Sequence, residues 1–310
     1  MVIDPGYHFM KNLHHFGLNV FDIQAVIITH GHIDHNNDMR LLDDLNSLLA
    51  NYRDTSEEQG KLKWYLDETS YKIAKVLQKK ESGFLRDKNL LYCITDEKSF
   101  SNFDSTEAYP IGQLIELTET VQLQTFQTQH IYDDSVNDYC PQTFGCSFTF
   151  QGAGEERKIA YTSDTRFFPD LVQKVCGADV LIANISSIYE DDYMLVKEKI
   201  KHLGYYGCYY LIKGIQKCEK KPKFVLISEF WNGKGDLRYD VTSQLSKELS
   251  SKDIHILPAE NGMVIDVKVL KMQCSQCGSF SNNIIIKRPA NLEERVDVIC
   301  ENCYYGGNSS

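Results

Sequence analysis

Apolar and polar residues follow two different periods along this chain, and segments of the two kinds alternate. Short apolar runs predict buried strands, whereas apolar residues spaced three and four apart predict amphipathic helices. Residues 25–29 (AVIIT) predict a strand, and residues 38–51, with leucines at 41, 42, 45, 48 and 49, predict a helix. A strand over 61–66 and a helix over 67–79 repeat this order. Such an alternation is typical of a layered α/β fold in which helices cover sheets.

The alternation continues to about residue 257. Further strands are expected at residues 90–94, 114–127, 147–150, 158–162 and 180–184, and two helix-and-strand pairs at 203–217 with 224–228 and at 242–250 with 254–257. Near residues 268–271 this pattern gives way to pairs of cysteines. We therefore expect a large domain over residues 1–270 and a small one over residues 271–310.

Two Cys-x-x-Cys pairs mark the small domain, Cys274 with Cys277 and Cys300 with Cys303. Each pair lets two thiolates bind one ion, and together they complete a tetrahedral all-sulfur zinc site with no position for water. The intervening residues 278–299 are slightly longer than the usual gap of about 15–20. Strand-like segments at 283–287 and 295–299 lie within that gap, as a zinc ribbon requires. We expect one structural zinc ion here, with two disulfides or chance pairs as the alternatives.

The other six cysteines have no repeating spacing, and we expect them to be thiols: Cys93, Cys140, Cys146, Cys176, Cys208 and Cys218. The N-terminus lacks the basic region and apolar core of a signal peptide, so a cytoplasmic protein is expected, where thiols stay reduced. No apolar run approaches the roughly 18 residues of a membrane span. The net charge of −10 argues against broad electrostatic capture of nucleic acid.

The segment with the most chemical content follows the first strand and reads His30-Gly-His32-Ile-Asp34-His35. Its potential ligands come directly after a buried strand and before a helix, where a tight turn can direct several side chains into one pocket. Imidazole and carboxylate ligands suit zinc, with manganese or iron as alternatives. Chance rarely produces this HxHxDH pattern, so we expect a metal site.

The HxHxDH pattern resembles that of the metallo-β-lactamase superfamily, which has a four-layer αββα fold. The resemblance continues in chain order over roughly residues 1–270. A strand ending in Asp-Pro-Gly precedes the pattern, at residues 3–6, and a lone histidine, His130, follows a later strand. Next come a strand ending at Asp164 and a buried strand over residues 178–184.

The resemblance implies two divalent ions in the large domain. One would be held by His30, His32 and His130, and the second by Asp34, His35 and a late ligand, with Asp164 bridging them. The family's late ligand is usually a histidine, whereas Glu229 occupies the matching position here. A carboxylate can bind the same ion and favours a harder metal. His202 is the remaining candidate for this role.

The resemblance also implies catalytic roles. Two ions polarise one water molecule and lower its pKa, and Asp34 would orient it and later protonate the leaving group. In the branch that includes tRNase Z, a histidine before the last strand–helix unit assists phosphate chemistry, and His202 is placed comparably. Lysines at 197, 199 and 201 and at 217, 220, 221 and 223 flank the late ligands and could reach phosphates, although such runs are more often solvated helix faces.

A second departure concerns the start of the chain. Family members have several strands before the Asp-Pro-Gly turn, whereas this chain begins almost on it. We therefore expect a fold short of its N-terminal strands. Such a sheet has an open edge, and a homo-oligomer or a partner chain covering that edge is expected.

Three functions are consistent with these features. The leading expectation is a metal-dependent hydrolase of phosphodiester bonds, of nuclease or phosphodiesterase type. Nucleic acid is one candidate for its phosphodiester substrate. The acidic charge favours a small-molecule hydrolase acting on a thioester, lactone or lactam. A third expectation is a non-catalytic docking module built on the zinc ribbon, which has no positive surplus with which to bind nucleic acid.

Overall fold

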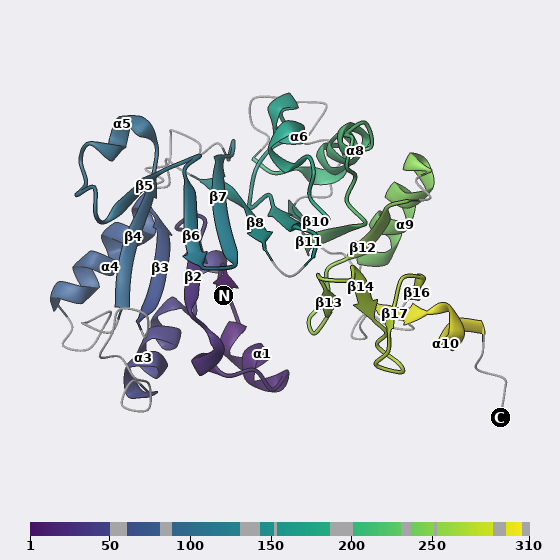
Figure 1. The fold of residues 1–310 in the computed structure, drawn as a ribbon, viewed down its shortest axis with the longest axis horizontal. Coiled ribbons are helices and arrows are strands. Elements are labelled where there is room, and N and C mark those ends of the chain that lie inside the picture. Colours follow the sequence, from purple (N-terminus) through teal and green to yellow (C-terminus); the bar gives the residue numbers. More distant parts are fainter. Residues whose placement is uncertain are drawn as a thin grey trace. The chain divides into compact units, whose positions relative to one another are not determined.

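The computed structural model describes residues 1–49, 61–80, 89–130, 143–151, 154–186, 201–230, 237–250, 253–287 and 296–305. The chain divides into two compact units, which Figure 1 colours from purple to yellow along the sequence. The first unit comprises residues 1–117 with short pieces between 124 and 144, and the second comprises residues 118–123, 128–131 and 145–310.

The first unit contains a five-stranded sheet in the order β1-β2-β3-β4-β5, in which every neighbouring pair is parallel. The strands are β1 (Val2–Ile3), β2 (Ala25–Ile28), β3 (Leu62–Asp67), β4 (Asn89–Thr95) and β5 (Ala108–Pro110). All four residues of β2 are buried. The continuous apolar run that predicted this strand is therefore explained by burial on both faces, which is usual in parallel sheets.

Helices connect these strands: α1 (Phe9–His15), α2 (Ile33–Asn36), α3 (Met39–Leu49), α4 (Glu68–Lys80) and α5 (Glu97–Phe100), with a short 3₁₀ helix, η1 (Val20–Asp22). A buried polar network lies in this core. The indole Nε1 of Trp64 donates to Asn89 Oδ1 at 3.0 Å, and the Asn89 amide donates to Asp43 Oδ1 at 2.9 Å. This network links α3 to β3 and β4, so the predicted amphipathic helix is held by hydrogen bonds as well as by its apolar face.

The second sheet has seven strands in the order β12-β11-β10-β9-β8-β7-β6. They are β6 (Leu114–Thr118), β7 (Val121–Gln127), β8 (Phe144–Phe150), β9 (Arg157–Tyr161), β10 (Val180–Ser186), β11 (Phe224–Phe230) and β12 (His255–Pro258). The single strand predicted over 114–127 is therefore wrong, because residues 119 and 120 form a turn between two strands. In the second unit β9, β10, β11 and β12 are parallel, whereas β8 is antiparallel to β9.

Helices α6 (Pro169–Val175), α8 (Gly204–Ile215) and α9 (Arg238–Leu249) belong to the second unit. Helix α8 packs on β10 and on α6, and α9 packs on β12. The approach of α8 to α6 is close at Gly214, where a Cβ atom would lie 2.5 Å from Val172. None of the helices in the described ranges is both long and apolar enough to cross a membrane.

The C-terminal part of the second unit is built from short elements: β13 (Ile265–Asp266), β14 (Lys271–Gln273), β15 (Phe280–Ser281), β16 (Ile284–Lys287), β17 (Asp297–Cys300) and α10 (Glu301–Tyr305). Cys274, Ile299 and Cys300 form a small buried cluster within this part, and other apolar residues pack against the large sheet. Met272 and Val298 pack in one buried cluster with Val180, Phe224 and Leu257 of the large sheet. The small cysteine-containing part is therefore anchored on the strands that precede it.

The cysteine prediction is wrong at two positions. Cys176 and Cys218, which are 42 residues apart, form a disulfide with their Cα atoms 6.0 Å apart. The packing of α6 against α8 brings the two together, and no spacing in the sequence indicates this. Cys93, Cys146 and Cys208 are buried thiols, as predicted, and Cys140 lies outside the described residues.

Candidate metal-binding sites

The HxHxDH segment lies at the carboxyl end of β2, and the Asp-Pro-Gly turn after β1 supports it. Asp4 accepts hydrogen bonds from the backbone N–H and the hydroxyl of Thr29, both at 2.8 Å. Its Oδ2 also lies 2.9 Å from Nδ1 of His35. Gly6 is required in the same turn, because a Cβ atom there would lie 1.6 Å from the backbone oxygen of Asp34.

Three imidazoles of this segment lie together in the first unit. Nε2 of His30 is 3.0 Å from Nδ1 of His32, and the ring centroids of His30 and His35 are 4.0 Å apart. His30 and His35 are buried, and His32 is half-buried. Asp34 is half-buried in the first turn of α2. The structure thus brings together the nitrogen donors that the motif predicts.

The contact between Asp4 and His35 fixes which ring nitrogen can bind a metal. A carboxylate only accepts, so Nδ1 of His35 carries the proton and the lone pair is on Nε2. This Nε2 atom is buried. Histidines that bind metals usually donate their other ring N–H to a carboxylate or a carbonyl, which fixes the tautomer and the orientation of the ring. The sequence showed Asp4 as part of the turn but did not reveal this contact.

The second unit brings together His130, Asp164 and His202. Nδ1 of His130 lies 2.9 Å from the backbone oxygen of Lys201, so this nitrogen donates and Nε2 carries the lone pair. That Nε2 lies 3.9 Å from Asp164 Oδ2, and Nδ1 of His202 lies 3.4 Å from the same oxygen. Asp164 is only 2% exposed. The predicted bridging carboxylate therefore lies between two predicted histidines of this unit.

The arrangement of His130 and Asp164 is that of two acceptors. A neutral His130 presents an electron pair from Nε2 toward a carboxylate oxygen, at a distance beyond the roughly 2.7–3.2 Å of an N–H···O bond. A proton or a cation between the two atoms makes such a buried arrangement favourable. A divalent cation bound by both groups is consistent with this geometry.

A left-handed residue lies at or near the carboxyl end of each of three neighbouring strands of the second unit. Ser163 follows β9 at φ 54°, Ser186 ends β10 at φ 53°, and Glu229 lies near the end of β11 at φ 55°. Non-glycine residues rarely adopt this conformation, and such strained positions concentrate at functional sites. The hydroxyl of Ser186 donates to Glu229 Oε2 at 3.3 Å. Ligands commonly bind at the carboxyl ends of parallel strands, which is where Glu229 lies.

The four ribbon cysteines form a compact cluster, as predicted. Their four Sγ atoms all lie within 4.8 Å of one another, and they belong to Cys274, Cys277, Cys300 and Cys303. The Cys300 N–H donates to Cys274 Sγ at 3.3 Å. Burial opposes ionisation of Cys274, but backbone N–H groups outweigh it and lower its pKa to about 6. A thiolate favoured by backbone hydrogen bonds is the form that binds zinc.

The donor sets fit the metals that the sequence predicts. Four converging sulfurs are a structural zinc set, and buried imidazoles with a carboxylate suit zinc, manganese or iron. Histidine tautomers fixed by Asp4 and by the Lys201 carbonyl are consistent with metal ligation. Both kinds of predicted site are therefore chemically equipped for divalent ions.

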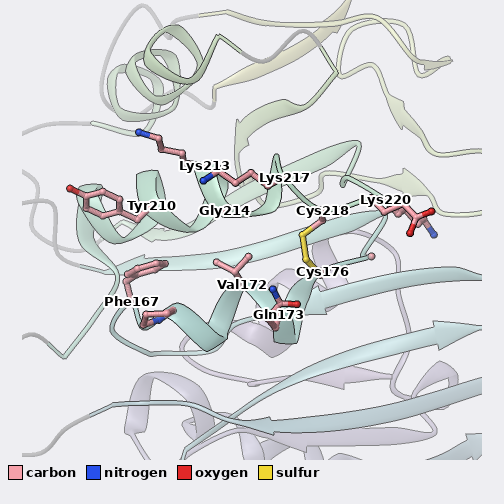
Figure 2. A pocket seen from close by; sticks show the side chains of 13 residues that line it. Phe167, Val172, Gln173, Cys176, Tyr210, Lys213, Gly214, Lys217, Cys218 and Lys220 are labelled. Carbon is pink, nitrogen blue, oxygen red and sulfur yellow. A yellow bond between two sulfur atoms is a disulfide. The ribbon is translucent and has the colours of Figure 1, made fainter.

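Two lysines of the later run bind other groups. Lys220 Nζ lies 2.8 Å from Asp179 Oδ2, and Lys223 Nζ lies 2.6 Å from Asn282 Oδ1. Residues 197 and 199 lie outside the described residues. A groove of about 910 Å³ lies between α6 and α8. Figure 2 shows the Cys176–Cys218 disulfide among the side chains that line it. Lys213, Lys217 and Lys220 also line it, and no predicted metal ligand does.

Comparison with solved structures gives several similar folds. YhfI of Bacillus subtilis, a metallo-β-lactamase fold protein, has a TM-score of 0.58 and 14% identity, covering 84% of this chain and 84% of its own. The short form of human tRNase Z has a TM-score of 0.58 and 16% identity, covering 86% and 87% of the two chains. Yeast PDE1 has a TM-score of 0.52 and 12% identity, covering 82% and 69%. No curated protein matches significantly.

These likenesses define the class: the chain has the metallo-β-lactamase fold, and its C-terminal four-cysteine cluster is consistent with a small zinc ribbon. The predicted fold class is therefore confirmed. The model of one protein family, described as Anti-Pycsar protein Apyc1, matches residues 1–191, which is more than half of the chain. The chain belongs to the Anti-Pycsar Apyc1 family.

Proposed function

We propose that this protein is a metal-dependent hydrolase of phosphodiester bonds. The observation that carries the proposal is the group formed by His130, Asp164 and His202, in which a buried carboxylate faces an imidazole electron pair at 3.9 Å. Membership of the Anti-Pycsar Apyc1 family and the fold shared with human tRNase Z and yeast PDE1 support it. The names of the last two point to phosphodiester substrates.

The resemblance to the metallo-β-lactamase superfamily supplies the ligand assignment for two divalent ions. By that assignment His30, His32 and His130 would hold one ion, Asp34, His35 and Glu229 would hold the other, and Asp164 would be shared by the two. The ions, when bound, supply Lewis-acid chemistry that lowers the pKa of water and stabilises negative charge on the phosphate. Zinc suits these ligands best, and the extra carboxylate of Glu229 also favours manganese or iron.

The protein's own groups would orient the reacting atoms and transfer protons. His202 is the candidate proton donor, because its side chain is 29% exposed while Nδ1 lies 3.4 Å from the Asp164 carboxylate. Nε2 of His202 could donate a proton to a phosphate oxygen or to the leaving group. Asp34 would orient the attacking water and return its proton to the product.

The charge of the chain favours a small phosphodiester over a long nucleic acid. A net charge of −10 repels a polyanion, whereas a single phosphodiester is attracted by the local positive charge of the ions. A small-molecule hydrolase acting on a thioester, lactone or lactam is the alternative that the same acidic charge supports.

A substrate panel separates these functions. Zinc-loaded and manganese-loaded protein would be incubated with bis-p-nitrophenyl phosphate, a cyclic nucleotide, single-stranded RNA, single-stranded DNA, a thioester and a lactone. We expect cleavage of the phosphodiesters, with the small ones cleaved faster than the polymers. Cleavage of the thioester or lactone alone would favour the alternative, and failure to cleave any phosphodiester would overturn the proposal.

Metal content separates an enzyme from a docking module. About three ions per chain are expected, two in the hydrolase site and one in the ribbon. A single ion that is lost on mutation of the ribbon cysteines would indicate the docking module and contradict the proposal.

A further inference from the structure

The centre of the second sheet contains a buried amide that neither the motif nor the ligand set includes. Asn184 lies in β10 opposite Ser228 of β11, and on its other side β10 pairs with β9, where Ile182 lies opposite Tyr161. The residue is 1% exposed. Asn184 therefore lies between the two strands that carry Asp164 and Glu229, near the carboxyl ends of both.

Every polar group of the Asn184 side chain is hydrogen bonded. Its Nδ2 donates to Asp164 Oδ1 at 3.2 Å and to the Tyr161 hydroxyl at 3.0 Å, and its Oδ1 accepts from the Ser228 hydroxyl. Its backbone N–H donates to the hydroxyl of Thr162 at 3.1 Å. Because a carboxylate only accepts, the contact with Asp164 fixes which end of the amide faces it.

The consequence concerns the second oxygen of Asp164. With Oδ1 bonded to the Asn184 amide, Oδ2 is the oxygen that faces His130 Nε2 at 3.9 Å and His202 Nδ1 at 3.4 Å. The Asp164 carboxylate can rotate about its Cα–Cβ and Cβ–Cγ bonds. A hydrogen bond to one of its oxygens limits that rotation. The amide thus selects one orientation of the carboxylate.

We propose that Asn184 is a positioning residue for the metal ligand Asp164. This inference rests on the proposed function, in which Asp164 bridges two ions. Hydrogen bonds to a ligating carboxylate orient it, and their loss typically lowers metal affinity about 10- to 100-fold. Asn184 acts through Asp164 and does not itself reach substrate.

The chemistry requires an amide at this position. Aspartate has the same shape but replaces the donor with a second carboxylate, so two negative acceptors would face each other in a buried place. Serine is neutral but too short to span the same distance. Both Asn184→Asp and Asn184→Ser remove the hydrogen bond to Asp164, by repulsion in the first case and by distance in the second.

The test is a titration of metal-free protein with Co²⁺, followed by visible absorption. Cobalt bound by thiolates gives intense charge-transfer bands, which report the ribbon and the integrity of the second unit. Cobalt bound by imidazole and carboxylate gives weaker bands, which report the hydrolase site. The two sites are therefore measured in one sample.

We expect Asn184→Asp and Asn184→Ser to weaken cobalt binding at the imidazole and carboxylate site about 10- to 100-fold, with the thiolate bands unchanged. Tyr161→Phe is the matched control, because it removes the other acceptor of the same Nδ2 group and leaves the bond to Asp164; we expect affinity within about threefold of wild type.

If Asn184→Asp and Asn184→Ser kept the thiolate bands and bound cobalt at the imidazole and carboxylate site with wild-type affinity, the inference would be overturned. The proposed function would be unaffected by that result. A loss of cobalt affinity in Tyr161→Phe as large as that in Asn184→Asp would also overturn the inference. The effect would then come from the general packing of the strand. A wild-type protein without imidazole and carboxylate bands would overturn the proposed function itself.

Discussion

Asp4 Oδ2 lies 2.9 Å from Nδ1 of His35, although 31 residues separate them in the chain. The contact joins the turn after β1 to helix α2, which contains the last residues of the HxHxDH segment. The same carboxylate accepts two hydrogen bonds from Thr29, so one buried side chain holds the strand end, the motif and the ring of a predicted ligand. Asp4 therefore positions a predicted ligand without being one of the predicted ligands itself.

Replacement of Asp4 by alanine should therefore impair both stability and metal binding. The substitution leaves three donors without this acceptor, and losses of this kind cost about 1–3 kcal/mol each when buried. We expect the free energy of unfolding, measured with urea, to fall by at least that amount. Asp44→Ala, which removes an exposed carboxylate on α3, is the control and should change the free energy little. Equal stability of Asp4→Ala and wild type would contradict the role of Asp4.

The His32→Ala variant tests the ligand assignment. Loss of one ligand from a catalytic metal site is expected to abolish hydrolysis, while the ribbon keeps its zinc because it lies in the other unit. Phosphodiester cleavage and zinc content measure the two effects. His14→Ala removes an exposed histidine in the last turn of α1 and should retain activity. Retained activity of His32→Ala would show that the assignment is wrong.

Removal of the ribbon zinc should expose apolar surface of the second unit. Met272 and Val298 pack with Val180, Phe224 and Leu257, and loss of the metal would release them. We expect Cys277→Ser to bind one zinc fewer and to increase the fluorescence of a dye that binds apolar surface. Gln276→Ala, in the same loop, should behave as wild type. A Cys277→Ser protein with full zinc content would argue against the four-sulfur site.

The Cys176–Cys218 disulfide should contribute to stability only under oxidising conditions. A cross-link that closes a loop of 42 residues stabilises a protein by about 2–4 kcal/mol. Cys176→Ser should lower the free energy of unfolding by that amount without reductant. With dithiothreitol, the variant and wild type should be equally stable. A difference that persists in reductant would trace the effect to packing between α6 and α8 instead.

Asp67 should make stability depend on pH. Burial raises the pKa of this carboxyl from its ordinary value of 3.8 to about 7, against the hydrogen bonds from Ser70 and Thr69 that lower it. Between these values the folded protein binds more protons than the unfolded chain, so stability should fall as the pH rises from about 4 to 7. Asp67→Asn removes the ionisation and should flatten this dependence in urea unfolding at several pH values.

The control for this prediction is Asp96→Asn. Asp96 caps α5 through the Ser99 N–H at 2.7 Å, much as Asp67 accepts from the Ser70 N–H at the start of α4, but Asp96 is only half-buried. If the pH dependence of stability survived in Asp67→Asn but disappeared in Asp96→Asn, the effect would belong to Asp96, and the prediction for Asp67 would be wrong.

Local chemistry could be predicted from the sequence. The apolar run of β2, the spacing of the leucines in α3 and the two Cys-x-x-Cys pairs each depend on neighbours in the chain. These patterns predicted the strand, the helix and the sulfur cluster, which the structure contains. The turn within residues 114–127 was missed, because both strands beside it have the same alternating pattern as one long strand.

The contacts between distant segments were decided by the tertiary structure. Asp4 reaches His35, Asn184 reaches Asp164, and Cys176 reaches Cys218 because strands and helices far apart in the chain lie side by side in the fold. An amide in a strand or a lone cysteine has no local signal that reveals its partner. The sequence by itself therefore predicted which groups could bind metal, since that prediction depends on their chemistry. The fold determined how those groups are oriented and held, since that depends on the strand neighbours each side chain meets.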